Sequence, residues 1–328
     1  MVRAMRVSKN QTTFLWLTAF MLTAAFFALW FAPNAAAQQL DYTVRDYGYK
    51  TGYAFKWRDF QGHVHSTSFK LDTNMVRKAS TEFQPFSNRE ANQHVFTTVK
   101  NYASRLRSRG ISMTVGSASR NGKVEIKAKG SSRRDLRREM NTVDRLIEKS
   151  RKQYIHNNMF RLYDENSVVP DHARIAQMNV RRMRPVARAL KKTAPRSLRG
   201  QINHTLAFLQ GIPYDQLLSR TNSNGSGFAT PVELLTRNIG DCDSKSVAMA
   251  SLLKNSHPRM NMVLVLVEDH AFVGVAGIRQ GPKDFALKIN NQTYVLAEPT
   301  GPALMPLGQI DKRSQRLLRT GDFNHVQL

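Results

Sequence analysis

The sequence contains one cysteine, Cys242, among its 328 residues. A single cysteine cannot form an intramolecular disulfide, which excludes a disulfide-rich scaffold and leaves packing to hold the fold. Acidic residues are also scarce, because 24 Asp and Glu stand against 49 Lys and Arg, for a formal net charge of +25. This excess favours anionic partners. Outside residues 14–32, the sequence lacks an apolar run long enough to cross a bilayer.

Residues 1–37 have the pattern of an export signal. Basic residues precede the apolar run at 14–32, and small residues at 35–37 offer a cleavage site. We expect cleavage after Ala37 and a periplasmic or secreted mature protein. Because the run is long enough to span a bilayer, the alternative is an uncleaved anchor in the inner membrane. A lone cysteine in an exported protein points to a reactive thiol.

Basic residues are concentrated in residues 131–200, where 18 Lys and Arg accompany 7 Asp and Glu. One interpretation is a solvated helical face. The other is a surface that binds an anionic partner, such as an envelope polymer, lipid headgroups or an acidic protein. Nucleic acid is not expected as a partner, because the chain has an export pattern.

Residues 38–165 are predicted to form a small basic α+β domain. Alternating residues predict strands, and apolar residues three and four apart predict helices. The elements expected here are a strand pair at 53–57 and 65–71, a helix at 91–106, a hairpin turning at Asn121 and Gly122, and a long basic helix through 136–147. Nothing in this domain indicates catalysis.

The sequence pattern changes at residue 201 and divides the remaining chain into a connector and a second domain. Residues 166–200 are predicted to be a basic helical connector, with one helix from Asp171 to about Lys192 whose inward residues are Ile175, Met178, Val186 and Leu190. A second domain is expected at 201–310, with helices followed by strands at 262–268, 271–278 and 292–298. Residues 311–328 are expected to be a C-terminal tail.

The stretch IGDCDSKSVAMASLL, residues 239–253, places the lone cysteine at the start of a predicted helix. Gly240 supplies a turn, Asp241 is a good N-cap, and the apolar residues that follow keep helical spacing. Unpaired N–H groups and the positive end of the helix dipole favour a thiolate at Cys242, and the same groups can hold an oxyanion. A packed structural cysteine is the alternative.

Two further polar residues stand at the ends of predicted strands. His270 lies where one strand ends and the next begins, and Glu298 ends the last strand, just before Pro299. A thiol enzyme needs a base close to the sulfur and a third group that orients the base. Steps of 28 positions lead from Cys242 to His270 and from His270 to Glu298.

This order of residues resembles the transglutaminase-like, or papain-like, cysteine peptidase and transglutaminase superfamily. The resemblance is carried by five segments in the right order: FLQGIPY (208–214), TPVELL (230–235), GDC (240–242), HAF (270–272) and EPT (298–300). It implies an α+β fold in which a helix bearing the cysteine packs on an antiparallel sheet bearing the histidine and the acid. The basic N-terminal half is not covered by the match.

The resemblance also implies roles for individual residues. Cys242 would be the nucleophile, His270 the base and Glu298 the group that orients the imidazole. The family usually has Asp in the third place, and Glu298 is one methylene longer. An additional oxyanion donor would come from the upstream segment, where Tyr214 and Gln210 are the candidates.

Other charged residues indicate little beyond structure. Asp241 and Asp243 resemble the acidic pair beside the nucleophile in a calcium-binding branch of these proteases, yet two carboxylates make a poor calcium site, and a cap and a first-turn acid are the simpler interpretation. No other cofactor or metal is expected. His63 and His65 are expected at the surface. His257 precedes a strand rather than capping it, and Asp269 would face away from His270.

The sequence therefore predicts an exported cysteine-dependent enzyme that acts on peptide or isopeptide amide bonds, with hydrolysis favoured because water is the abundant acceptor. Amine acyl transfer, which crosslinks proteins, is the alternative for the same triad. A non-catalytic protein that binds an anionic envelope component through its basic half is the alternative from another class.

Overall fold

The computed structural model describes residues 39–106, 110–116, 124–163, 167–218, 226–268 and 270–328. The expected leader or anchor at 14–32, the turn at Asn121 and Gly122, and Asp269 lie outside these residues. Residues Gln38–Leu328 form one compact unit. It is an α+β unit, as predicted, and its named strands pair antiparallel. In the part of the chain that is described, no helix is long and apolar enough to cross a membrane.

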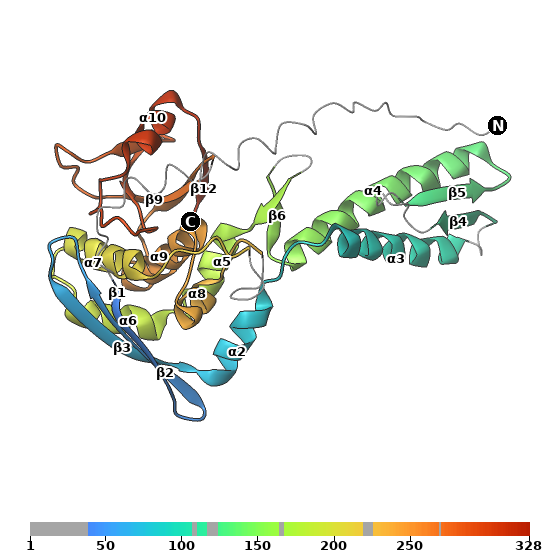
Figure 1. Cartoon of the computed structure of the whole chain (residues 1–328). Coiled ribbons are helices and arrows are strands. Elements are labelled where there is room, and N and C mark those ends of the chain that lie inside the picture. The colour runs from blue at the N-terminus through green and yellow to red at the C-terminus, as the bar shows by residue number, and fades with distance from the viewer. Residues whose placement is uncertain (1–38, 107–109, 117–123, 164–166, 219–225, 269) are drawn as a thin grey trace, which may run out of the picture. The chain divides into compact units, whose positions relative to one another are not determined.

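The first sheet contains the predicted strand pair and one strand more. Its order is β1 (Gln39–Asp46), β2 (Lys50–Arg58) and β3 (Val64–Asp72), drawn in blue in Figure 1. Tyr53 pairs with Phe69 across β2 and β3, and Phe55 and Trp57 are buried on the same face. Period-two alternation puts these side chains on one side of the sheet, where they enter the main core.

Helix α2 (Thr73–Glu82) follows the first sheet, and its Ala79 belongs to the main core. A helical hairpin with its own small core comes next. Its elements are α3 (Asn88–Leu106), β4 (Ser112–Gly116), β5 (Glu125–Lys129) and α4 (Arg133–Asn157). Helices α3 and α4 pack together beside the β4–β5 pair (Figure 1). Val95 and Val99 of α3 meet Val143 of α4 in the core, which confirms the helix, hairpin and helix that the sequence predicted.

The predicted helix at 171–192 is two helices. After β6 (Phe160–Leu162) and β7 (Val168–Pro170), the chain forms α5 (His172–Asn179) and α6 (Arg184–Thr193). Pro185 stands in the first turn of α6, and a proline lacks the N–H and clashes with the carbonyl four residues back, so one helix cannot continue through it. Met178, inside α5, is 38% exposed and was wrongly predicted to face inward, while the other three residues predicted to face inward are buried.

The described residues from Leu198 onward form four helices and a five-stranded sheet. The helices are α7 (Leu198–Gly211), α8 (Pro231–Arg237), α9 (Cys242–Ser256) and α10 (Lys312–Thr320). The strands, in sheet order, are β10 (Ala286–Ile289), β11 (Gln292–Ala297), β9 (His270–Ala276), β8 (Met262–Val267) and β12 (Asn324–Gln327). The expected C-terminal tail thus supplies a helix and an edge strand.

Both faces of this sheet are covered. Val295 and Ala297 of β11 belong to the main core with α9, whereas Tyr294 and Leu296 pack in a second core with Leu318 of α10. Helix α9 contacts strands β8 and β9 and helices α5, α6, α7 and α8. Because α9 is surrounded by other elements, it lacks the polar face of a surface helix. These contacts fix the position of the helix and therefore of Cys242, its first residue.

The main core joins segments that the sequence assigned to different domains. Phe55 of β2 meets Phe208 of α7 edge to face, with ring centroids 5.1 Å apart, and Phe83 meets Phe228 in the same way at 5.1 Å. These contacts connect residues 38–165 with residues 201–310. The first sheet and the helices around α9 therefore share one core.

Candidate active site

Cys242 is the first residue of α9, as the sequence predicted. The Asp241 carboxylate caps the helix, where its Oδ1 accepts the Ser244 N–H at 3.2 Å. Gly240 is fixed by two backbone hydrogen bonds, from its own N–H to Pro213 O and from Asp215 N–H to its O, both 3.2 Å. A Cβ at Gly240 would lie 2.6 Å from Leu234 Cδ1, so only glycine fits this approach to the helix.

His270 and Glu298 meet at one end of the five-stranded sheet. His270 begins β9 and Glu298 follows β11, and these strands are antiparallel neighbours, with Val273 opposite Ala297. The His270 Nε2 and the Glu298 Oε2 share a hydrogen bond. The other carboxylate oxygen accepts the Thr300 N–H at 3.1 Å, and Glu298 is buried. The imidazole therefore has a fixed partner on one nitrogen.

The cysteine end of α9 lies against the same part of β9. Ser246, one helical turn after Cys242, donates its hydroxyl to Ala271 O at 3.4 Å, next to His270 in the chain. The Glu298 carboxylate is close enough to act electrostatically on the Cys242 thiol. Helix packing thus places the Cys242 end of α9 beside the start of β9 and puts Glu298 within electrostatic range of the thiol.

Electrostatics at the thiol differ from the sequence-based expectation of a thiolate. Cys242 is half-buried, and this burial is the main cause that raises the pKa of its thiol far above the usual value. The carboxylates of Asp243 and Asp241 raise that pKa further, and Glu298 adds a smaller effect. These effects make the thiol harder to ionise. Its use as a nucleophile therefore requires a base.

The two oxyanion candidates occupy different environments. Tyr214 forms a bridge with Gly240 beside the start of α9, and its side chain is 48% exposed. Burial raises the pKa of the Tyr214 hydroxyl, and the nearby Cys242 raises it further, so the hydroxyl keeps its proton and can donate. Gln210 is buried, and its Nε2 donates to Glu298 O at 2.6 Å and Met305 O at 2.9 Å. Both amide hydrogens of Gln210 are occupied, so it supports the acid's segment and is not a donor to an oxyanion.

His172 is a neighbour of the site that the sequence analysis missed. It is 3% exposed, and its Nε2 lies 2.8 Å from Asp243 Oδ2. Burial is the main cause that lowers the pKa of His172 to about 4. The sequence predicted this residue at the start of a helix. No sequence pattern indicated its contact with Asp243, because the contact joins α5 to α9 across 71 positions.

The acidic pair does not fit a calcium ion. Asp243 Oδ1 accepts the Ser244 N–H at 2.9 Å while its other oxygen faces His172, and Asp241 serves as the cap. Calcium takes six to eight oxygen ligands, which these two carboxylates do not supply. Within the described ranges, no group of three or more His, Cys, Asp and Glu side chains is placed to hold a metal.

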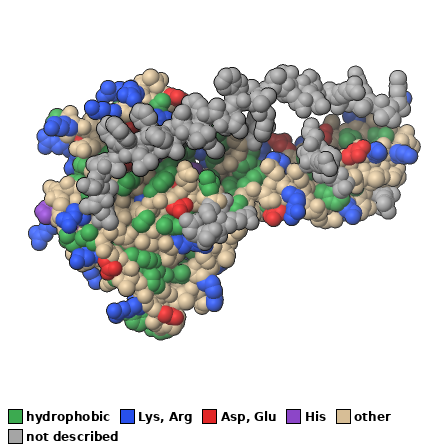
Figure 2. All heavy atoms as spheres, viewed as in Figure 1, with side chains coloured by type: hydrophobic (Ala, Val, Ile, Leu, Met, Phe, Trp, Pro, Cys, Tyr) green, Lys and Arg blue, Asp and Glu red, His purple; other side chains and the backbone are tan. Residues whose placement is uncertain are grey.

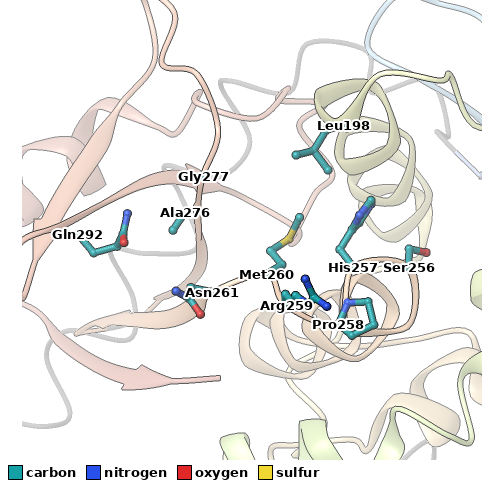
Figure 3. A pocket seen from close by; sticks show the side chains of 10 residues that line it. All are labelled: Leu198, Ser256, His257, Pro258, Arg259, Met260, Asn261, Ala276, Gly277 and Gln292. Atoms are coloured by element: carbon teal, nitrogen blue, oxygen red, sulfur yellow. The ribbon is translucent and has the colours of Figure 1, made fainter.

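The remaining histidines lie elsewhere. His65 is partly buried, with its Nε2 2.8 Å from Asp59 Oδ2, while His63 is exposed and 3.5 Å from the same oxygen. His257 follows the last residue of α9, at the opposite end from Cys242, and its Nε2 lies 3.0 Å from Gln201 Oε1. It lines a hollow of about 630 Å³ with residues that include Met260 and Gln292 (Figure 3). The length of α9 separates that hollow from Cys242.

No family model, no curated protein and no solved structure matches the chain. The residues of the site comprise a thiol with a raised pKa at a helix N-terminus, an imidazole bonded to a buried carboxylate, and a phenol beside the same helix end. Together these groups can carry out nucleophilic attack on a carbonyl with proton transfer.

Proposed function

We propose that this chain is an exported cysteine-dependent enzyme of the transglutaminase-like type that hydrolyses peptide or isopeptide amides. The observation that carries the proposal is the hydrogen bond between His270 Nε2 and the buried Glu298 carboxylate, formed at the point of the sheet against which the Cys242 end of α9 packs. A helix bearing the cysteine, packed on an antiparallel sheet bearing the histidine and the acid, supports a papain-like core.

In this mechanism the Cys242 sulfur attacks the amide carbon while His270 Nδ1 takes the thiol proton. The Glu298 carboxylate accepts the Nε2–H and stabilises the imidazolium. The carbonyl oxygen becomes an oxyanion, which the Cys242 N–H and the Tyr214 hydroxyl stabilise. The tetrahedral intermediate collapses to a thioester as the imidazolium gives its proton to the leaving amine. Water, deprotonated by His270, then cleaves the thioester and restores the thiol.

Hydrolysis is preferred over transfer to an amine. Water is the abundant acceptor outside the cytoplasm, and its exclusion would require a shaped amine tunnel. Acyl transfer by the same triad, which would crosslink proteins, is the alternative outcome of the test.

The test compares the exported proteomes of cells carrying the wild-type chain and Cys242→Ser. Mass spectrometry should find new protein termini that depend on Cys242, which would also identify the substrate. New isopeptide crosslinks instead of termini would establish transfer. Identical termini and crosslinks in both strains, with both proteins present at equal levels, would contradict the proposal.

A second candidate function, binding of an anionic envelope component, is favoured by an arginine-lined hollow on α4. The hollow has a volume of about 480 Å³, and its lining residues are Arg133, Arg134, Arg137, Arg138, Asn141 and Arg145. Arg138 pairs with Asp135 at 3.4 Å. Among the described residues, Arg133, Arg134 and Arg137 have no acidic partner. Figure 2 shows Lys and Arg side chains spread over the visible face, with fewer Asp and Glu among them.

The binding function predicts a localised effect of charge removal. The triple substitution Arg133→Gln, Arg134→Gln and Arg137→Gln should lower the salt concentration that elutes the protein from a dextran sulfate column. The control removes three exposed positive charges from α6, through Arg188→Gln, Lys191→Gln and Lys192→Gln. An equal decrease in both variants would mean that retention follows net charge alone and that the hollow has no binding role.

A further inference from the structure

Lys245 is fully buried in the described structure, with 0% of its surface exposed, although it belongs to the residue types that are rarely buried. It lies in the first turns of α9, three residues after Cys242. Its Nζ donates one hydrogen bond to Ile212 O at 2.5 Å and another to Thr300 O. Burial of an amine is costly unless hydrogen bonds compensate for the lost water, so these two contacts explain how the residue is accommodated.

The two carbonyls belong to the segments on either side of the proposed site. Ile212 follows the end of α7 and stands two residues before Tyr214, the candidate oxyanion donor. Thr300 stands two residues after Glu298, and its N–H donates to the Glu298 carboxylate at 3.1 Å. One side chain of the nucleophile's helix is therefore bonded to both the Tyr214 segment and the Glu298 segment.

The Lys245 amine also interacts electrostatically with residues of the proposed site. Burial is the main cause that lowers the pKa of Lys245 to about 7, while Glu298, Asp241 and Cys242 act in the opposite direction. An amine has at least two hydrogens whether it is charged or neutral, so it can donate to both carbonyls in either state. The contacts with Ile212 and Thr300 therefore do not depend on its charge.

We propose that Lys245 is a positioning residue that fixes the Tyr214 and Glu298 segments against the Cys242 end of α9. This inference rests on the proposed function. Loss of the two hydrogen bonds would release the Thr300 backbone, which orients the Glu298 carboxylate and, through it, the His270 imidazole. Small displacements of such groups are costly, since an error of about 1 Å can lower a rate by about 100-fold.

The test measures the rate at which iodoacetamide alkylates Cys242, which needs no substrate. Because the chain has one cysteine, a single adduct observed by intact-protein mass spectrometry reports this thiol alone. Lys245→Met keeps the length of the side chain and removes its donors. The matched control is Lys254→Met, since Lys254 lies on the same helix and its Nζ donates to Met260 O at 2.9 Å, near the other end.

We expect Lys245→Met to be alkylated about 10-fold more slowly at pH 7 than the wild type, and Lys254→Met to match the wild type. The decisive variant is Lys245→Met combined with His270→Ala. If Lys245 acts through the imidazole, the double variant should be no slower than His270→Ala alone, because members of one unit fail together. Additive losses in the double variant would make the role of Lys245 independent of the triad and overturn the inference.

Two outcomes separate the inference from the proposed function. If His270→Ala slows alkylation while Lys245→Met does not, the positioning role is wrong and the proposed function stands. If His270→Ala leaves alkylation unchanged, the proposed function itself fails. Should Lys245→Met not fold, as judged by circular dichroism, Lys245→Gln provides the second measurement. It keeps an uncharged N–H donor and adds no volume at this buried position, so it should alkylate clearly faster than His270→Ala, and a loss as large as that of His270→Ala would contradict the inference.

Discussion

At the scale of single residues, Glu298 is the member of the proposed triad whose two carboxylate oxygens both accept a hydrogen bond. Glu298→Gln keeps an oxygen that can accept from His270 but removes the charge that stabilises the imidazolium. We expect turnover of the substrate to fall by about 10- to 10,000-fold with the fold intact. Turnover equal to that of the wild type would remove Glu298 from the triad and direct attention to another carboxylate.

Tyr214 permits a test of transition-state stabilisation alone. Tyr214→Phe removes only the hydroxyl, and the loss of one oxyanion donor lowers kcat by about 100-fold or more while leaving KM nearly unchanged. The control is Tyr49→Phe, which removes a hydroxyl from an exposed ring that is distant from Tyr214 in the sequence. A change in KM with no change in kcat would show that Tyr214 binds the substrate without stabilising the oxyanion.

His204 predicts how stability depends on pH. It is buried beside Trp57 and His65, and its Nε2 lies 3.0 Å from Thr193 Oγ1. Burial lowers the pKa of His204 to about 4, and the neighbouring His65 lowers it further while Asp59 opposes the shift. The unfolded chain therefore binds the proton more readily between pH 6.5 and 4. The free energy of unfolding should fall as the pH falls through this window.

His204→Gln should make that fall shallower, because the amide can keep the bond to Thr193 and does not titrate. The decrease in slope is at most about 1.4 kcal/mol per pH unit, which corresponds to one proton. Urea unfolding at several pH values between 4 and 7 measures it, and His325→Gln on exposed β12 is the control. Identical slopes in wild type and His204→Gln would contradict the assignment.

At the scale of elements, the loop after β11 is bound tightly to the end of α7. Gly301 has φ +67°, and a Cβ there would lie 2.4 Å from Gln210 O. Gly301→Ala should therefore displace the loop that holds Glu298 and lower both activity and the free energy of unfolding. Gly321→Ala is the matched control, because its φ is +80° but its Cβ would meet nothing within 4 Å.

The difference between these two variants isolates the contact from the backbone strain. The control should lose about 1 kcal/mol in thermal or urea unfolding, the usual cost of a left-handed conformation for a residue with a Cβ. Gly301→Ala should lose clearly more, with reduced turnover. Equal losses in the two variants would mean that the approach of Gly301 to Gln210 does not position the loop.

Local sequence patterns predicted individual helices and strands better than helix breaks and strands that depend on long-range pairing. The cap at Asp241 and the strand pair through Tyr53 and Phe69 depend on neighbouring residues, so the sequence was sufficient for both. The same helical spacing suggested one helix through Pro185, where the proline's own geometry required a break. Strand β12 was missed because its short, exposed sequence gains its order from pairing with β8.

The part of the candidate site that could be predicted from the sequence is the set of partners that a catalytic cysteine needs. A catalytic cysteine requires a base and a group that orients the base, and this requirement selected His270 and Glu298, which form a hydrogen bond. The positions of Lys245 and His172 depend on packing between elements distant in the chain, and no local pattern indicated them. The thiol pKa likewise reflects burial and the acids around the folded site, which oppose the effect of the helix end.

At the scale of the whole molecule, the shared core changes how the basic N-terminal half is understood. Trp57 of β2 packs edge to face on Phe208 of α7, with ring centroids 5.2 Å apart, and Tyr42 of β1 donates its hydroxyl to Thr236 O of α8 at 2.8 Å. The first sheet is therefore a structural support of the helices around α9. The arginine-lined hollow lies instead on α4, where the anionic partner is proposed to bind.

The proposed function requires the imidazole of His270 to activate the thiol of Cys242. The decisive experiment is therefore the pH dependence of iodoacetamide alkylation of wild type and His270→Ala between pH 6 and 9. The wild type should react at neutral pH even though burial and neighbouring carboxylates raise the pKa of the thiol, and His270→Ala should react at least about 10-fold more slowly there. Superimposable profiles would show that the imidazole does not serve the thiol, and the proposed function would be wrong.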